Sequence, residues 1–255
     1  MGLEILRVEN IEEKYQAQNG EVTALENISF SMDKGEFMSI VGPSGCGKST
    51  LLSILAGLLK PTAGAVYVKG EKVEGISGHI GYMLQKDSLM DWRTIYSNVL
   101  FGLEVRHMLT QETVDRAVQL LKTYGLYEFK DKYPAQLSGG MRQRAALIRT
   151  LAINPDILLD EAFSALDYQT RLTVTEDVYR ILKQEAITTV MVTHDIPESI
   201  SMGDRILVLT ARPARVKEIL DIDFGMDHRT PLSCRNNPKF GQYFDHIWKE
   251  LGMHA

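Results

Sequence analysis

The sequence predicts an α/β domain that carries a mostly helical insertion. In the first part of the chain, short apolar runs alternate with helical segments. One such run, Phe37–Val41, leads through a glycine-rich turn into a helix that extends to about Leu59. From Lys86 to about Leu137 this alternation stops and helical periodicity takes over. A chain of 255 residues is long enough for one large α/β domain, or for a core with one insertion.

Strands are predicted where apolar and β-branched residues form short runs bounded by turn-forming residues. These runs are Leu3–Val8, Val22–Phe30, Phe37–Val41, Ala65–Val68, Ile80–Leu84, Ile157–Leu159, Thr188–Thr193, Arg205–Leu209 and Arg215–Ile222. The first two flank a predicted turn at Lys14–Gly20, whose residues are mostly polar.

Helices are predicted where apolar residues recur at helical spacing between capping and stop signals. In the clearest case Thr110 can cap the start, Glu112 favours the positive end, and Gly125 stands where the helix stops. Other predicted helices begin at the glycine-rich turn, at Leu137–Arg144, at Asp167 and at Pro238. Pro61 cannot continue the first of these.

The composition limits the kinds of partner. Apolar residues make up 44% of the chain and charged residues 24%, which is ordinary for a soluble globular protein. The net charge of −5 argues against a nucleic acid as the main partner, because such partners need a basic face. Cys46 and Cys234 provide no disulfide framework, no apolar run approaches about 20 residues, and the N-terminus lacks a signal-peptide pattern. We therefore expect a reduced, cytosolic setting.

The glycine-rich turn has the composition of a phosphate-binding loop. It fits G-x-x-x-x-G-K-[ST] between a strand and a helix, with the residues Gly42, Pro43, Ser44, Gly45, Cys46, Gly47, Lys48, Ser49 and Thr50. Glycines let several backbone N–H groups point at one anion, and the helix N-terminus adds partial positive charge. Lys48 is placed to reach the outer phosphates and Ser49 to bind Mg²⁺. The alternative, a turn that binds nothing, does not explain the complete motif in this context.

Further polar residues follow other predicted strands. Asp160 and Glu161 come directly after one, Gln85 after another and His194 after a third. Each has an ordinary structural explanation when taken alone, since strand-end carboxylates are usually solvated and most histidines are structural. Together they lie at the carboxyl ends of predicted parallel strands, where α/β proteins bind ligands. Tyr15, near the first turn, could be either a partly buried core residue or a platform for a ligand.

The segment Leu137–Arg144, with the sequence LSGGMRQR, resembles the signature of the ATP-binding subunits of ABC transporters. The other family markers follow in the family's order over Leu3–Leu209. They are Tyr15, the phosphate loop, Gln85, Asp160-Glu161, Ser164-Ala165-Leu166-Asp167 and Thr193-His194-Asp195. The resemblance implies a P-loop NTPase (RecA-like) core with an N-terminal antiparallel β subdomain and an inserted helical subdomain.

The resemblance also implies how one ABC ATPase domain, residues 1–255, is divided. Residues 1–85 and 154–225 would form the catalytic core and the antiparallel β subdomain. Residues 86–153 would form the helical subdomain with the signature, and residues 226–255 a C-terminal helical tail.

The site roles that the resemblance implies concern ATP and Mg²⁺. Tyr15 would stack on adenine, Ser49, Gln85 and Asp160 would hold Mg²⁺, and Glu161 would be the catalytic carboxylate, with Gln85 and His194 assisting. Ser138, Gly139 and Gly140 form a second helix start suited to an anion, which one nucleotide cannot use within the same subunit. In this family, they bind the ATP of a second copy, which implies a homodimer with two composite sites.

A narrower resemblance concerns the segment after Gln85. Ser88–Thr94, with Asn98-Val99 and Gly102–Glu104, is similar to importer ATPases for nitrate, alkanesulfonates and taurine, although Asp91 replaces their usual proline. It implies transmembrane permease subunits and an extracytoplasmic solute-binding protein as partners, and a peripheral position on the cytoplasmic face of the membrane. The solute itself stays open.

One stretch departs from the family pattern. Only Ile157–Leu159 precede Asp160, where four apolar residues are usual, and Ala162 replaces the proline that usually follows the Asp-Glu pair. Since one residue of register reverses the faces of a strand, we expect the missing residue to be absorbed near Asn154–Asp156. Two alternatives stay open: a soluble ABC ATPase acting on DNA repair or ribosomes, and a nucleotide-gated scaffold with little hydrolysis.

Overall fold

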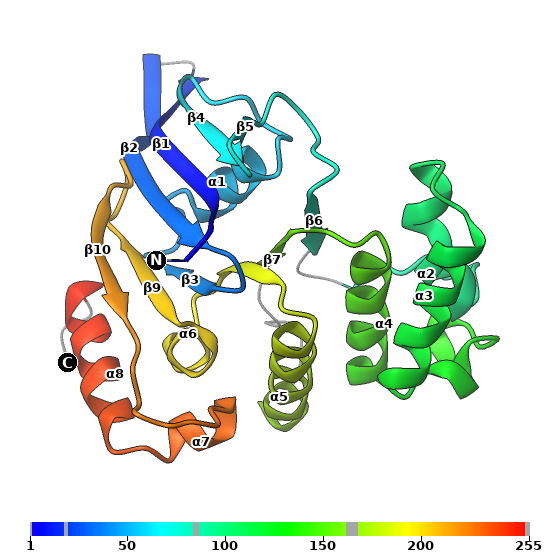
Figure 1. The fold of residues 1–255 in the computed structure, drawn as a ribbon. Coiled ribbons are helices and arrows are strands. Elements are labelled where there is room, and N and C mark those ends of the chain that lie inside the picture. Colours follow the sequence, from blue (N-terminus) through cyan, green and yellow to red (C-terminus); the bar gives the residue numbers. More distant parts are fainter. Residues whose placement is uncertain (1, 18–19, 84–86, 162–167, 253–255) are drawn as a thin grey trace.

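Two β-sheets and a group of helices make up the computed structural model, which describes residues 2–17, 20–83, 87–161 and 168–252 (Figure 1). The first sheet contains four strands in the order β2-β1-β4-β5 and is antiparallel. Its strands are β1 (Glu4–Ala17), β2 (Gly20–Asp33), β4 (Ala63–Val68) and β5 (Glu71–Lys72). The predicted α/β class with an N-terminal antiparallel sheet is thereby confirmed.

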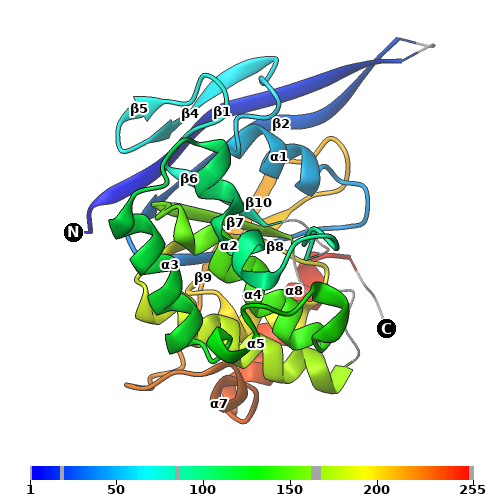
Figure 2. The same cartoon turned by 90° about the vertical axis from the view of Figure 1, so that its right-hand side faces the viewer.

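The β1–β2 hairpin is longer than the sequence predicts. Lys14–Ala17, predicted as part of a turn, belong to β1, where Lys14 pairs with Thr23 and Tyr15 with Val22. The hairpin extends beyond the rest of the molecule (Figure 2). Its end is solvated on both faces, so its residues are polar and the sequence alone does not distinguish them from a turn.

The second sheet has six strands in the order β10-β9-β3-β8-β7-β6. These are β3 (Phe37–Val41), β6 (Ile80–Met83), β7 (Ile157–Glu161), β8 (Thr188–Val192), β9 (Arg205–Leu209) and β10 (Val216–Asp221). All neighbours are parallel except β10, which pairs antiparallel with β9 at the edge. The carboxyl ends of β3, β8, β7 and β6 therefore share one edge of the sheet.

The helices are named in chain order. They are α1 (Lys48–Leu55), α2 (Ile95–Val105), α3 (Gln111–Thr123), α4 (Gly139–Ala152), α5 (Tyr168–Gln184), α6 (Ile196–Met202), α7 (Pro231–Arg235) and α8 (Lys239–Glu250), with 3₁₀ turns η1 (Tyr127–Phe129) and η2 (Pro134–Gln136). Thr110 caps α3 by accepting from the Thr113 N–H, as predicted. None of the helices in the described part of the chain is long and apolar enough to cross a membrane.

Two differences from the predicted helices have physical causes. Helix α1 ends at Leu55 rather than near Leu59, because Gly57 has a φ of +71° and a Cβ there would lie 1.9 Å from the Gly75 carbonyl oxygen. Helix α6 was not predicted. Its signals are an N-cap aspartate, Asp195, and a proline in the first turn, Pro197, but the segment is short.

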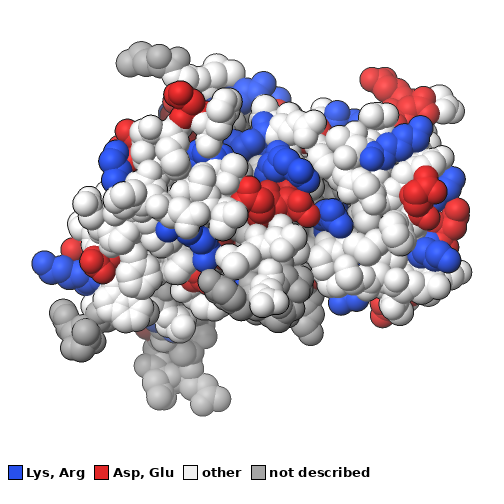
Figure 3. Space-filling model, turned by 90° about the horizontal axis from the view of Figure 1, so that it is seen from below, with Lys and Arg blue, Asp and Glu red and all other residues white. Residues whose placement is uncertain are grey.

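The six-stranded sheet separates two hydrophobic cores. Met38 and Ile40 of β3 pack with the apolar side of α1 and the antiparallel sheet, whereas Phe37 packs on the other face, 6.4 Å from the Tyr179 ring of α5. Helices α2, α3 and α4 lie together to one side of the sheet (Figure 1). On the face that Figure 3 shows, basic and acidic side chains are interspersed.

Candidate nucleotide site

Three segments with predicted site residues leave the same edge of the parallel sheet. In the strand register Ile40 of β3 lies beside Val192 of β8, and Val192 lies beside Glu161 of β7. The phosphate loop and His194 follow directly in sequence. With strands about 4.8 Å apart, the phosphate loop and the end of β7 are separated by about 10 Å. The fold thus brings the loop, His194 and the Asp160-Glu161 pair to one edge.

The phosphate loop is closed around the Lys48 ammonium group. Lys48 Nζ donates to the Gly42 and Pro43 carbonyl oxygens at 2.7 and 2.9 Å. The backbone of Gly45 (φ +72°) and Gly47 (φ +124°) is left-handed, a conformation that strains other residues. A Cβ at Gly47 would also lie 2.8 Å from Leu25 Cδ2. Both the backbone conformation and this close contact therefore favour glycine at position 47.

The start of α1 is suited to bind an anion. Among the described residues no side chain caps it, and its first turn carries no acid. Its first N–H groups and the positive end of its dipole are therefore available to phosphate oxygens. The Ser49 side chain is exposed in this first turn. Cys46 contributes only backbone, because its thiol is 1% exposed in the core beneath the loop.

Tyr15 reaches the phosphate-loop helix from the β1–β2 hairpin. Its hydroxyl lies 3.2 Å from Thr50 Oγ1, while the side chain stays 41% exposed. An aromatic ring fixed beside the start of α1 and open to solvent can stack against a planar base. Tyr15 is therefore not a buried core residue.

Asp160 lies at the edge but is covered. Its carboxylate is 1% exposed, and its register neighbours Met83 and Met191 belong to the core on the α4–α5 side of the sheet. Glu161 ends β7. Gln85, Ala162 and the Ser164–Asp167 segment lie outside the described residues.

The shortened stretch before Asp160 does not disturb the strand. Strand β7 pairs without a bulge with both β6 and β8. Just before it, Asp156 accepts from His79 Nδ1 at 2.6 Å and forms an ion pair with Lys69 at 2.7 Å. Partial burial opposes ionisation of Asp156, but these two partners outweigh it and lower its pKa. The beginning of β7 is therefore anchored to the antiparallel sheet.

Ser138, Gly139 and Gly140 form the start of α4. Ser138 Oγ accepts from the Met141 N–H at 3.3 Å, and the two glycines open the helix. Helices α4 and α1 lie apart in both ribbon views (Figures 1 and 2). Within one chain, the phosphate-loop helix and the LSGGMRQR helix are therefore separate.

Two arginines of α4 donate hydrogen bonds to the segment that follows Gln85. The sequence did not predict these contacts. Arg142 Nε donates to Asp87 Oδ2 at 3.0 Å. Arg149 donates to the Ser88 and Asp87 carbonyl oxygens at 2.7 and 3.0 Å. The LSGGMRQR helix is therefore tied directly to the stretch after Gln85.

Residues 25–164 match the family model described as ABC transporter. The chain belongs to the ABC transporter family. It is an ATP-binding cassette and an ATPase, as the LSGGMRQR segment and the phosphate loop indicated, and the resemblance is confirmed.

Similar proteins cover nearly the whole cassette. An uncharacterized ABC transporter ATP-binding protein of Bacillus subtilis, YtlC, is 46% identical over 98% of this chain and 96% of its own length. The nitrate import ATP-binding protein NrtD of Synechocystis is 38% identical over 95% and 93%. Proteins named for taurine import and aliphatic sulfonate import are also similar.

A solved structure is similar in fold as well as sequence. The ATP-binding cassette MJ0796, in a dimeric post-hydrolysis state bound to ADP and Pi, has a TM-score of 0.70 and 32% identity. It matches 86% of this chain and 99% of its own.

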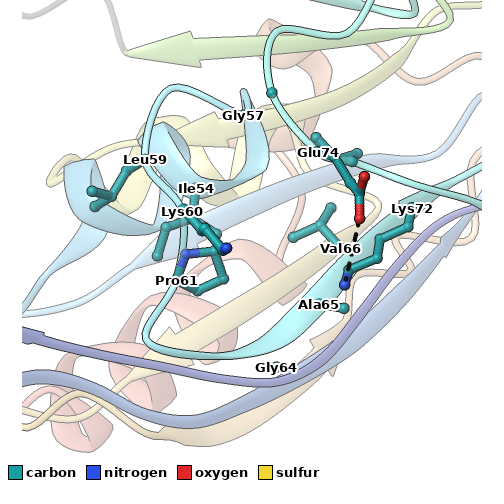
Figure 4. A pocket seen from close by; sticks show the side chains of 12 residues that line it. Ile54, Gly57, Leu59, Lys60, Pro61, Gly64, Ala65, Val66, Lys72 and Glu74 are labelled. Carbon is teal, nitrogen blue, oxygen red and sulfur yellow. Dashed lines mark ion pairs between the residues drawn. The ribbon is translucent and has the colours of Figure 1, made fainter.

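Two hollows of the cassette lie away from the phosphate loop. One, of about 360 Å³, lies between β4–β5 and the C-terminal end of α1, near Ile54 and Gly57 (Figure 4). Because α1 has eight residues, this pocket is about 12 Å along the helix from the loop. The other, of about 390 Å³, is a groove between the end of α1, the β6 approach, α2 and α4.

Proposed function

We propose that this cassette is the ATP-hydrolysing subunit of an ABC importer for nitrate, a sulfonate, taurine or a similar small solute. The observation that carries the proposal is the alignment of the phosphate loop, His194 and Asp160-Glu161 on neighbouring strands. The names of the similar import proteins support the solute class. A soluble DNA-repair or ribosome ATPase and a scaffold with little hydrolysis have no such support.

Hydrolysis requires charge neutralisation and a positioned water. The loop N–H groups and Lys48 would hold the β- and γ-phosphates, with Tyr15 against the adenine. Glu161 would orient the attacking water, and His194 would donate to the γ-phosphate. Gln85 would touch both the water and the metal.

The oxygen donors at this edge fit Mg²⁺. Ser49 offers an exposed hydroxyl, and Asp160 a carboxylate that can act through water; hard oxygen ligands of this kind suit Mg²⁺. When bound, Mg²⁺ would neutralise developing charge on the phosphate oxygens.

The active form would be a homodimer. Since α1 and α4 lie apart, Ser138, Gly139 and Gly140 would bind the ATP held by the partner's phosphate loop. An isologous pair then has two composite sites. The dimeric state of the MJ0796 cassette supports this arrangement.

The permease would dock at the groove between α1, α2 and α4. Apolar residues line it, among them Leu58, Phe101 and Val105, and Ile76 at its edge is 77% exposed. The neighbouring loop is rigid because the buried Asn98 side chain bonds to both Met90 backbone groups and to the Arg93 and Thr94 carbonyl oxygens. Met90 of this loop lines the groove, and Trp92 of the same loop is 76% exposed.

The remaining assignments follow from this docking. The helical stretch 86–153 would be the subdomain that contacts the permease, 1–85 and 154–225 the catalytic part, and 226–255 a tail. The assembly would place the cassette on the cytoplasmic face of the membrane, with an extracytoplasmic solute-binding protein delivering the solute.

Phosphate release by the purified cassette, alone and with its permease in vesicles, tests the proposal. We expect hydrolysis that needs Mg²⁺, is lost in Lys48→Ala and increases with the permease. Deleting the subunit should abolish uptake of one small anion or sulfonate. Hydrolysis that is absent even with the permease would favour the scaffold instead.

A further inference from the structure

A buried acid, Glu198, follows His194 by four residues in the sequence. Glu198 of α6 is 2% exposed, and no described lysine or arginine forms an ion pair with it. Thr193 Oγ1 donates to its Oε2 at 2.6 Å, and Oε1 has no hydrogen-bond partner among the described residues. An acid is costly to bury in this way, so its presence calls for a specific role.

Glu198 forms a closed circuit of hydrogen bonds with Thr193 and Asp195, the two residues that flank His194. The Asp195 N–H donates to Thr193 Oγ1 at 3.0 Å, and the Thr193 hydroxyl donates on to Glu198. The Glu198 N–H donates to Asp195 Oδ1 at 2.9 Å, which completes the ring. His194 itself takes no part and is exposed. Both of its neighbours are therefore fixed while its ring is left free to act.

This circuit differs from an ordinary helix start. In a capping box, the acid at the third helical position bonds back to the N-cap backbone N–H. Here Asp195 is the N-cap and Glu198 stands at that third position, yet its carboxylate bonds to the Thr193 side chain instead. Thr193 belongs to the sheet edge, since its N–H donates to the Ile40 carbonyl oxygen at 3.2 Å. Glu198 thus connects α6 to the strand end beside the phosphate loop.

We propose that Glu198 is a positioning residue that, through Thr193, fixes the turn carrying His194 and so directs the imidazole toward the γ-phosphate. This rests on the proposed role of His194. Because an ionised carboxylate only accepts, Thr193 must donate to it, which leaves the Thr193 oxygen free to accept from Asp195. The direction of the hydrogen bond from Thr193 to Glu198 is then determined, and with it the conformation of the turn that carries His194.

The charge state of Glu198 changes this arrangement near neutral pH. Burial raises the pKa of Glu198 to about 7, with Asp195 raising it further and Thr193, Arg171 of α5 and Arg235 of α7 lowering it. A protonated carboxyl can itself donate, so the Thr193 hydroxyl loses its obligatory direction below that pH. The turn is therefore held more firmly above pH 7 than below it.

The experiment measures kcat and KM for ATP in the full cassette between pH 6 and 8.5. Thr193→Val should lower kcat about tenfold with KM for ATP nearly unchanged, and Thr193→Ser should restore it. Glu198→Gln should flatten the rise in kcat near pH 7. Thr189→Val is the matched control, because Thr189 is buried in β8, the strand that Thr193 follows, and its hydroxyl donates to the Ile187 carbonyl oxygen instead.

The outcomes separate the inference from the proposed function. If His194→Ala loses activity while Thr193→Val keeps both kcat and the pH profile, the positioning role is wrong and the ATPase assignment stands. If His194→Ala keeps full activity, the proposed role of His194 fails, and the inference with it. A loss in Thr193→Val that Thr193→Ser does not restore also counts against it.

Discussion

The Arg142 guanidinium lies 3.0 Å from the Asp87 carboxylate, so the helix with the LSGGMRQR segment is ion-paired to the stretch after Gln85. The two side chains are 36% and 29% exposed, and such a pair adds only about 0.5 kcal/mol to stability. Its effect should therefore appear in coupling between α4 and the groove proposed as the permease docking site, whose wall includes Ser88 and Met90.

Arg142→Ala should lower permease-stimulated ATP hydrolysis several-fold while the melting temperature changes little. Phosphate release in vesicles with and without the permease measures this. Arg144→Ala is the matched control, because Arg144 forms a comparable pair on α4, with Asp177 at 3.3 Å, away from Asp87. Equal effects of the two variants would exclude a special role for the Arg142–Asp87 pair.

Tyr15→Ala should raise KM for ATP about tenfold, since an aromatic platform contributes about 1–3 kcal/mol to stacking on a base. Tyr15→Phe keeps the ring and loses only the contact with Thr50, so its KM should stay within about twofold of the wild type. Steady-state hydrolysis at varied ATP measures both. A large effect of Tyr15→Phe would show that the hydroxyl, not the ring, matters.

Glu161→Gln should bind ATP and lower kcat at least about a hundredfold, because the residue would orient the water and not the nucleotide. The trapped ATP should hold two copies together, which light scattering detects as a doubled mass. Combining it with Ser138→Arg should give a monomer that still binds ATP. An ATP-loaded Glu161→Gln protein that stays monomeric would contradict the composite site.

Glu198→Gln should stabilise the protein at pH 8 more than at pH 5. Burial raises the pKa of Glu198 from an ordinary 4.5 to about 7 in the folded state. The stability linked to its protonated form is therefore complete below about pH 4.5 and is lost as the pH rises through 7. Glutamine stays neutral, so the variant should gain up to roughly 3 kcal/mol above pH 7. Denaturant unfolding at both pH values measures the difference, and equal gains at both would contradict it.

The phosphate loop and its strand could be predicted because their signal is local. Apolar residues at Phe37–Val41 and glycines at Gly45 and Gly47 dictate strand and turn without knowledge of the rest of the chain. The edge that gathers Asp160 and His194 follows from the parallel order of the sheet. In these cases, a short stretch of sequence contains the whole physical cause.

What could not be predicted depends on distant partners. Lys14–Ala17 are strand only because β2 pairs with them, and α6 is held at its C-terminal end by Arg229, which donates to the Ile200 and Gly203 carbonyl oxygens. Asp87 and Glu198 carry no motif signal of their own. Their partners Arg142 and Thr193 identify them, and only the folded chain reveals those contacts.

The separation of α1 from α4 has a genetic consequence. In the proposed homodimer, a copy damaged only at Ser138–Gly140 would keep its own phosphate loop but would disable the site of whichever intact copy it joins. Expressed beside the normal gene, such an allele would produce dimers of one normal and one damaged copy in which one site is disabled, so it would behave as dominant. An allele whose protein does not fold would form no such dimers and would be recessive.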